Sequence, residues 1–120
     1  MEDHLRPDKS VFVKTGSRIK RIQSKDILYV DCKGNISTIH LQGGKQISSV
    51  RLLKLVEQDL AGTSFIRINH NCLVNLDEVE EIHYVNARKH QLTLSEGTVL
   101  DVSYRKWKQV KDALLRHHEV

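Results

Sequence analysis

Short stretches in which apolar and polar residues alternate cover the first fifty residues, and this period of two predicts β-strands. The stretches are Phe12–Thr15, Arg18–Ile22, Ile27–Asp31, Asn35–Leu41 and Gln46–Ser48. Gly16 and Ser17 separate the first two and predict a hairpin, because glycine adopts a positive φ without steric cost. The residues 42–45 predict a further turn. The first half of the chain is therefore expected to consist mostly of strands.

The period changes to three or four residues at two places, which predicts two helices. The first is marked by Val50, Leu53, Val56 or Glu57, and Leu60. We expect it to end at Ala61-Gly62, since glycine commonly terminates helices. The second is marked by Trp107, Val110 and Leu114. Ser103 precedes this helix and is expected to be its N-cap.

Strand patterns return between the two predicted helices. They cover Phe65–Ile68, Cys72–Asn75, Val79–Val85, Gln91–Leu94 and Val99–Val102. Many short strands with frequent turns, and no regular alternation of strand and helix, predict a mainly antiparallel β fold. A chain of 120 residues is long enough for one domain. We expect this domain over residues 11–120, after a flexible lead-in over residues 1–10.

Composition excludes several classes of protein. Charged residues make up 28% of the chain and hydrophobic residues 39%, which is typical neither of a disordered segment nor of a membrane protein. No apolar run approaches the roughly 18 residues of a membrane span, and the first ten residues lack the apolar stretch of a signal peptide. A cytoplasmic location is therefore expected.

Basic residues exceed acidic ones by 19 to 15, which favours an anionic partner such as nucleic acid. Two clusters contribute most of the basic charge. The first contains Lys14, Arg18, Lys20, Arg21 and Lys25, and the second contains Arg105, Lys106, Lys108, Lys111 and Arg116. A cluster of charged residues is commonly just a solvent-exposed face. This interpretation is favoured for the first cluster when that cluster is considered by itself. In the second cluster, positive side chains lie at a helix start, where the helix dipole disfavours them. A phosphate or base edge bound nearby would explain their presence there.

No pattern in the sequence indicates an enzyme. His70 and Cys72 are neighbours, but residues two apart in a strand are not aimed at each other as base and nucleophile. Cys32 and Cys72 are forty residues apart and match no metal or redox motif, so we expect two reduced thiols. The seven histidines have no metal-ligand spacing, and no cofactor or metal is expected.

Three polar residues, Asn69, His70 and Asn71, lie in a row between two apolar strands. Side chains of this kind can read base edges or hold phosphates. They can equally form an Asx-rich turn that only reverses the chain. The residue types alone leave both interpretations open.

Three segments in order resemble the LytTR family of DNA-binding domains. Phe65–Asn75 (FIRINHNCLVN), followed by Val79 and Ile82, is similar to its central F-x-R-x-H-[RK]-S-x-x-V-N signature. Asp26–Asp31 (DILYVD) resembles an upstream family strand, and residues 94–97 and 102–106 resemble its closing motifs. The resemblance extends from about residue 12 to residue 115. It departs from the pattern at four positions. Asn69 stands where the family commonly has His, and His70 stands where it commonly has Arg or Lys. Asn71 stands where it commonly has Ser, and Tyr104 where it commonly has Arg.

The resemblance implies an elongated stack of small antiparallel sheets, a β-β-β sandwich, with two short helices. It also implies the output domain of a bacterial transcription regulator of the two-component, response-regulator type. Loops between strands of such domains contact the grooves of double-stranded DNA. The expected partner is duplex DNA with paired direct repeats, occupied by two copies of the domain, and an upstream receiver domain often precedes such domains in the full-length protein.

The resemblance also assigns residues to the DNA interface. Phosphate contacts are expected from Lys33, Arg67, Lys106 and Lys108, and sequence choice from Asn35, His70 and Arg105. The remaining interface residues are Asn69, Asn71 and Ser103. A neutral His70 lacks the charge that arginine supplies, so DNA binding is expected to weaken as the pH rises. The alternative function is a protein-interaction or regulatory β module whose basic surface is incidental.

Overall fold

The computed structural model describes residues 8–117, and this part of the chain folds into ten strands and two α-helices. The strands are β1 (Ser10–Thr15), β2 (Arg18–Gln23), β3 (Ile27–Lys33), β4 (Ile36–Leu41), β5 (Gln46–Ser49), β6 (Phe65–Asn69), β7 (Cys72–Asn75), β8 (Val79–Asn86), β9 (Lys89–Leu94) and β10 (Val99–Val102). The helices are α1 (Leu53–Asp59) and α2 (Tyr104–His117). Single 3₁₀ turns are η1 (Ser24–Asp26), η2 (Gln42–Gly44) and η3 (Leu76–Glu78).

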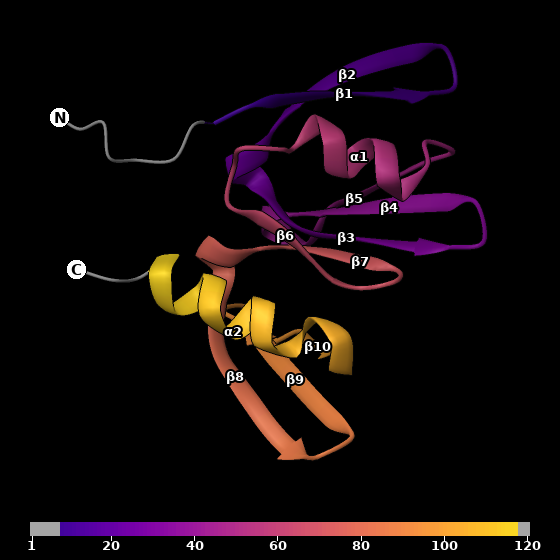
Figure 1. Ribbon diagram of the computed structural model, residues 1–120. Coiled ribbons are helices and arrows are strands. Elements are labelled where there is room, and N and C mark those ends of the chain that lie inside the picture. The colour runs from indigo at the N-terminus through magenta and orange to yellow at the C-terminus, as the bar shows by residue number, and fades with distance from the viewer. Residues whose placement is uncertain (1–7, 118–120) are drawn as a thin grey trace, which may run out of the picture.

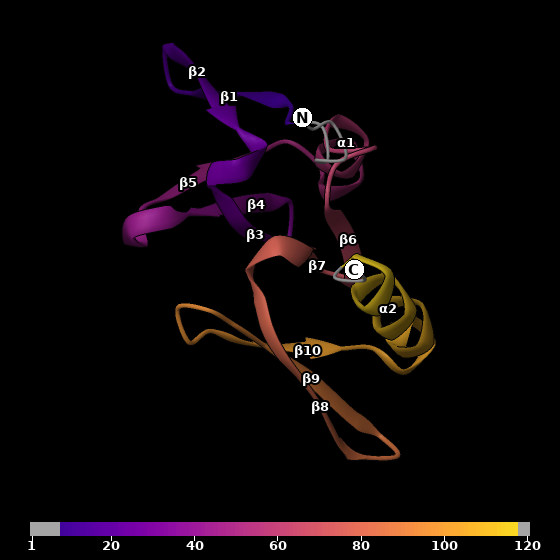
Figure 2. The same cartoon turned by 90° about the vertical axis from the view of Figure 1, so that its left-hand side faces the viewer.

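Three antiparallel sheets are stacked along the molecule (Figure 1). The middle sheet has the strand order β5-β4-β3-β7-β6, so β7 pairs with β3 although some forty residues separate them in the sequence. The β1–β2 hairpin lies with α1 on one side of it, and the sheet β10-β9-β8 lies with α2 on the other (Figures 1 and 2). The predicted stack of small antiparallel sheets with two helices is confirmed.

Side chains on the two faces of the middle sheet supply two separate hydrophobic clusters. Ile27 and Val30 of β3 pack with the β1–β2 hairpin and α1. Leu28 of the same strand packs on the opposite face, with β8–β10 and α2. Leu28 and Val30 lie on opposite faces although they are two residues apart, because a bulge in the pairing of β3 with β4, between Ile27 and Tyr29, interrupts the regular alternation. Within residues 8–117, no helix has the length and apolar composition that crossing a bilayer requires.

Helix α1 begins three residues later than the period predicts. Val50 lies outside the helix and is 72% exposed. The carbonyl of Arg51 accepts a hydrogen bond from the Ser37 hydroxyl at 2.7 Å, and Leu52 has extended φ and ψ angles. The link between β5 and α1 is therefore held against β4 in an extended conformation, and the helix starts only at Leu53.

The start of the described chain is bonded to η1. Lys9 and Ser24 exchange two hydrogen bonds, from Lys9 N–H to the Ser24 hydroxyl at 3.0 Å and from Ser24 N–H to the Lys9 carbonyl at 2.7 Å. The Asp8 carboxylate accepts a further bond from Lys25 N–H at 3.0 Å. Ser10 is already the first residue of β1. Residues 1–7 of the expected lead-in lie outside the described residues, as does His118.

Several chain reversals lie on one side of the molecule. The β1–β2, β3–β4 and β6–β7 turns and the start of α2 are on the right-hand side of Figure 1. The start of β1 and the end of α2 are on the left-hand side. The fold therefore brings segments far apart in the sequence to one surface.

Candidate nucleic-acid interface

The β6–β7 turn is held by the side chain of Asn69. Its Oδ1 accepts a hydrogen bond from Asn71 N–H at 2.7 Å, and its Nδ2 donates to the carbonyl of Asp101 at 2.7 Å. The first bond closes an Asx turn, and the second ties the turn to β10. The interpretation of the polar residues as a chain reversal therefore describes Asn69, whereas His70 and Asn71 are exposed at the tip.

Arg67 donates three hydrogen bonds, two of them to the backbone of the same turn. Its Nε donates to the Asn69 carbonyl at 3.2 Å, and one terminal nitrogen donates to the His70 carbonyl at 2.8 Å. The other terminal nitrogen forms an ion pair with Glu57 of α1 at 2.7 Å. The guanidinium therefore fixes the backbone on which His70 is carried. A bulge in the pairing of β6 with β7 lies at the same place, between Arg67 and Asn69.

The start of α2 is attached directly below this turn. Ser103 N–H donates to the carbonyl of Ile68 at 2.9 Å, and the Ser103 carbonyl accepts from Lys106 N–H at 3.0 Å. The helix begins at the next residue, Tyr104, as the expected N-cap position of Ser103 requires. Arg105 is exposed and Lys106 is half-buried. Two cations thus lie at a helix end whose own partial charge is positive, which favours a bound anion.

A hollow of about 380 Å³ lies between the turn and the helix start. Its lining residues are Glu57, Arg67, Asn69, His70, Ser103, Arg105 and Lys106. All except Glu57 are residues that the sequence predicts for the interface. Glu57 was missed because only the three-dimensional contact of α1 with β6 makes it the partner of Arg67. With Glu57 paired to Arg67, Arg105 and Lys106 leave the hollow with a positive charge.

The β3–β4 turn carries the predicted residues Lys33 and Asn35, and both are exposed. Gly34 between them has a φ of 62°, which glycine adopts without strain. Cys32 N–H donates to the carbonyl of Asn71 at 2.9 Å, so this turn is joined to the β6–β7 turn. Lys33, Asn35 and Asn71 therefore flank the hollow without lining it. Lys108 does not line it either, and is exposed farther along α2.

Cys72 follows the turn but faces the interior. Burial raises the pKa of its thiol to about 12, with the charge of Asp31 acting in the same direction and that of Arg67 opposing it. The thiol is therefore neutral near pH 7, which argues against a thiolate nucleophile here. Among the described residues, no group of His, Cys, Asp or Glu side chains has the arrangement of a metal site.

Comparison with known proteins agrees with the sequence resemblance. The model of the LytTr DNA-binding domain family matches residues 17–115. A solved structure described as the LytTr DNA-binding domain of a methyl-accepting/DNA response regulator from Bacillus cereus has a TM-score of 0.76 and 19% identity. The match covers 88% of this chain and 96% of that one, so the folds agree. A search of curated proteins gave no match. Because the family model covers most of the sequence, this chain belongs to the LytTR family of DNA-binding domains.

Proposed function

We propose that this domain binds double-stranded DNA with sequence preference, through the turns between strands and the start of α2. The observation that supports this most is the hollow in which His70, Arg105 and Lys106 meet. His70, in the β6–β7 turn, and Arg105, at the start of α2, are exposed, so a duplex can reach both. The neighbouring β3–β4 turn adds Lys33 and Asn35 to the same surface.

The side chains differ in what they can contribute to such a complex. Arg105 can donate two hydrogen bonds to the major-groove edge of guanine. His70 and Asn35 each have both donor and acceptor capacity and can distinguish base edges. Lys33, Lys106 and Lys108 are flexible point charges suited to phosphates, and these contacts carry affinity without sequence preference.

Arg67 is assigned differently from the other cations. Three of its five N–H groups already bond to Glu57 and to the backbone of the turn. We therefore assign it mainly to positioning His70, with its remaining N–H groups available to a phosphate. Asn69 has the same positioning role, because both polar atoms of its side chain bond within the protein.

The biological setting follows from the family and is part of the proposal. The domain would serve a bacterial two-component regulator in the cytoplasm, joined to a receiver domain in the full-length protein. Two copies would occupy paired direct repeats in one promoter. This arrangement needs no enzymatic activity of the domain itself.

Selection from a random DNA library tests the proposal. The purified domain is incubated with random duplexes at two salt concentrations, and the bound DNA is recovered over several rounds and sequenced. A recurring motif at both salt concentrations is expected, with affinity decreasing as salt increases because binding releases counterions.

The selection also separates the competing interpretations. Retained DNA without a motif, lost at the higher salt concentration, would leave only a basic surface. The protein-interaction module would then be the better description. Binding that does not change with salt would contradict the phosphate contacts assigned to Lys33, Lys106 and Lys108.

A further inference from the structure

We propose that the β1–β2 hairpin is an additional DNA contact. It binds phosphates next to those turns to which base contacts are assigned, and it contributes affinity without sequence preference. The inference rests on the proposed function, because it extends the same interface to a duplex already bound by His70 and Arg105. It concerns Lys14, Arg18, Lys20 and Arg21, which lie outside the hollow at the start of α2.

The hairpin has an unusual charge for its size. Residues 10–23 contain the four basic residues Lys14, Arg18, Lys20 and Arg21 and no acidic residue, so the formal charge is +4. All four side chains are exposed. None of them forms a salt bridge with another described residue. Their charge is therefore available to an external anion.

The pairing of the two strands distributes these charges over both faces of the hairpin. Lys14 is opposite Ile19, and Arg18 is opposite Thr15. Lys20 is opposite the buried Val13, yet Lys20 itself is exposed. The tip of the hairpin therefore extends beyond the hydrophobic cluster that holds its base. A duplex approaching the turns meets positive charge on either face of this tip.

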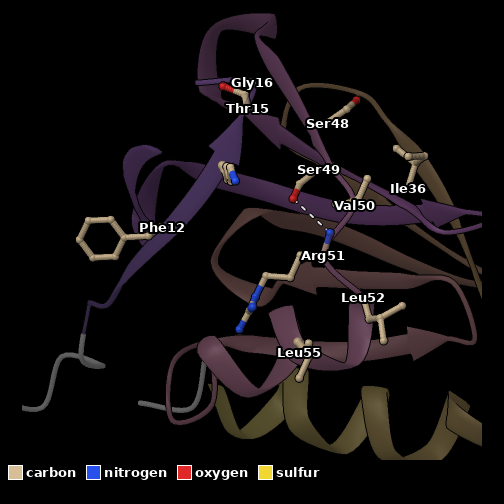
Figure 3. Close-up of a pocket in the computed structure, with 11 residues that line it drawn as sticks. Phe12, Thr15, Gly16, Ile36, Ser48, Ser49, Val50, Arg51, Leu52 and Leu55 are labelled. Atoms are coloured by element: carbon tan, nitrogen blue, oxygen red, sulfur yellow. Dashed lines mark hydrogen bonds between the residues drawn. The ribbon is translucent and has the colours of Figure 1, made fainter. Parts of the chain in front are cut away.

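A groove of about 720 Å³ lies between the hairpin, the strands β4 and β5, and the start of α1 (Figure 3). Lys14, Thr15 and Gly16 line it on the hairpin side. Ile36 and Ser48 line the side of β4 and β5. Ile36 directly follows Asn35 of the β3–β4 turn, so the groove begins where the proposed base contacts end. Much of the remaining lining is apolar, from Phe12, Val50, Leu52 and Leu55, so the phosphate contact is assigned to the charged side chains of the hairpin and not to the groove itself.

Position supports the same partner. The β1–β2 turn is on the side of the molecule that also carries the β3–β4 and β6–β7 turns (Figure 1). These three turns and the start of α2 are here called the row of turns, and a contact at the β1–β2 turn would lengthen the proposed interface at one end of this row. Phosphates occur at every base pair along a duplex, so such a contact requires no particular sequence.

The competing explanation is protection of the hairpin edges. A two-stranded sheet leaves both edges unpaired, and lysine or arginine at an edge discourages pairing with another chain. This explanation predicts that removing the charges causes aggregation and leaves DNA binding unchanged. The two explanations can therefore be separated by one set of variants.

The test compares two triple variants that lose the same charge. The hairpin variant carries Lys14→Gln, Arg18→Gln and Lys20→Gln. The matched control carries Lys25→Gln, Lys111→Gln and Arg116→Gln, all exposed and outside the row of turns. Binding to the selected motif and to random duplex is measured between 50 and 200 mM salt, the range over which counterion effects are large. Thermal unfolding followed by circular dichroism verifies that both variants are folded.

The hairpin variant should bind both DNAs about 10- to 100-fold more weakly at low salt, with the same preference for the motif. The slope of the logarithm of the binding constant against the logarithm of the salt concentration should become shallower by about 2 to 3. Each lost phosphate contact reduces the magnitude of this slope by about 0.9. The control variant should keep most of the parent slope. If the triple hairpin variant does not fold, the three single variants should each lower the slope by up to about 0.9.

Other outcomes overturn the proposal in distinguishable ways. A hairpin variant with the parent slope, whether or not it aggregates, shows that the hairpin does not contact DNA while the proposed function stands. Equal losses in the hairpin and control variants reduce the effect to net charge. A parent domain that binds neither DNA overturns the proposed function, and the hairpin contact fails with it.

Discussion

Arg67 shows how a basic residue of the proposed interface can act on the protein itself. Replacing it with alanine removes two hydrogen bonds under the β6–β7 turn and the ion pair with Glu57. We expect Arg67→Ala to lower the free energy of unfolding by about 1–3 kcal/mol, measured by urea denaturation. Lys108→Ala, at an exposed position, should change it by less than about 0.5 kcal/mol. Unchanged stability in Arg67→Ala, together with a shallower salt slope, would restore Arg67 as a phosphate contact.

Arg105 and Lys108 are expected to differ in the kind of affinity they supply. Arg105→Ala should reduce discrimination at one base-pair position by about 1–3 kcal/mol, because a bidentate contact to guanine is lost. Lys108→Ala should weaken binding to all sequences alike. Competition assays with the selected motif and its single-base variants measure both effects. Equal losses on cognate and random DNA from Arg105→Ala would contradict its role in base recognition.

The thiol of Cys72 gives the domain a predictable alkaline sensitivity. Its pKa is raised by burial from 9.0 to about 12, so above pH 9 the unfolded chain loses this proton while the folded chain keeps it. The folded state then binds more protons, and the free energy of unfolding decreases as the pH rises. One such group contributes about 1.4 kcal/mol per pH unit between pH 9 and 12.

Urea denaturation of the parent and of Cys72→Ala at pH 8, 9 and 10 measures this contribution. The decrease in stability from pH 9 to pH 10 should be smaller in the variant, even though alanine lowers its stability at every pH by leaving a cavity. Tyr29, whose pKa is also raised by burial, acts in the same direction and is present in both proteins. Parallel pH profiles would show that the thiol is not protected from ionisation in the folded state.

Helix α2 is the element whose packing decides where Arg105 is presented. Val110 is fully buried, and the Trp107 ring lies 4.4 Å from that of His90. Val110→Ala should cost about 1–3 kcal/mol of stability, because it leaves a cavity under the middle of the helix. Leu115→Ala, at a 65% exposed position of the same helix, is the matched control. Urea denaturation should separate the two, and equal losses would mean that the helix is not held through Val110.

The elements that the sequence predicts best are those in which periodicity reports burial directly. The strands β7 and β10 match the predicted segments exactly, and Val110 of α2 is buried as the three-to-four-residue spacing requires. Val50 fits the same spacing as α1, but a hydrogen bond from Ser37 to the Arg51 carbonyl keeps the chain extended. Periodicity indicates which residues are buried and does not indicate which competing bond will hold the backbone.

The candidate site could be predicted by residue type but not by contact. Arg105 and Lys106 are recognisable from their charge, and His70 from its position in the family signature, where the family commonly has Arg or Lys. The ion pair of Arg67 with Glu57 could not be predicted, because it joins two residues ten apart that lie on different elements with a loop between them. Likewise, Asn69 could be either a base reader or a turn former until its bonds to Asn71 and Asp101 were seen.

At the scale of the whole molecule, one strongly basic and one strongly acidic segment lie in different places. The β1–β2 hairpin carries four basic residues and no acidic one, for +4. The segment Leu76–Glu81 contains Asp77, Glu78, Glu80 and Glu81 and no basic residue, for −4. It follows β7 on the left-hand side of Figure 1, away from the row of turns. Such a field orients a domain as it approaches a polyanion and raises the rate of productive encounters.

The length of the molecule sets the length of DNA that one domain can protect. Its longest dimension is 45 Å, which corresponds to about 13 base pairs at roughly 3.4 Å per base pair. If the row of turns follows the duplex, hydroxyl-radical footprinting on one selected site should show protection over about this length. Protection confined to about half a helical turn would mean that only α2 and the β6–β7 turn touch the DNA.

The start of β1 and the end of α2 both lie on the side opposite the row of turns. If DNA binds along the row of turns, a fluorescent protein or a surface tether joined beyond β1 or α2 is expected to be attached on the side away from the duplex. Labelled domains could be followed on single DNA molecules, or immobilised on a sensor, without the label covering His70 or Arg105. The same geometry leaves room for a neighbouring domain on this side while the turns remain free to engage DNA.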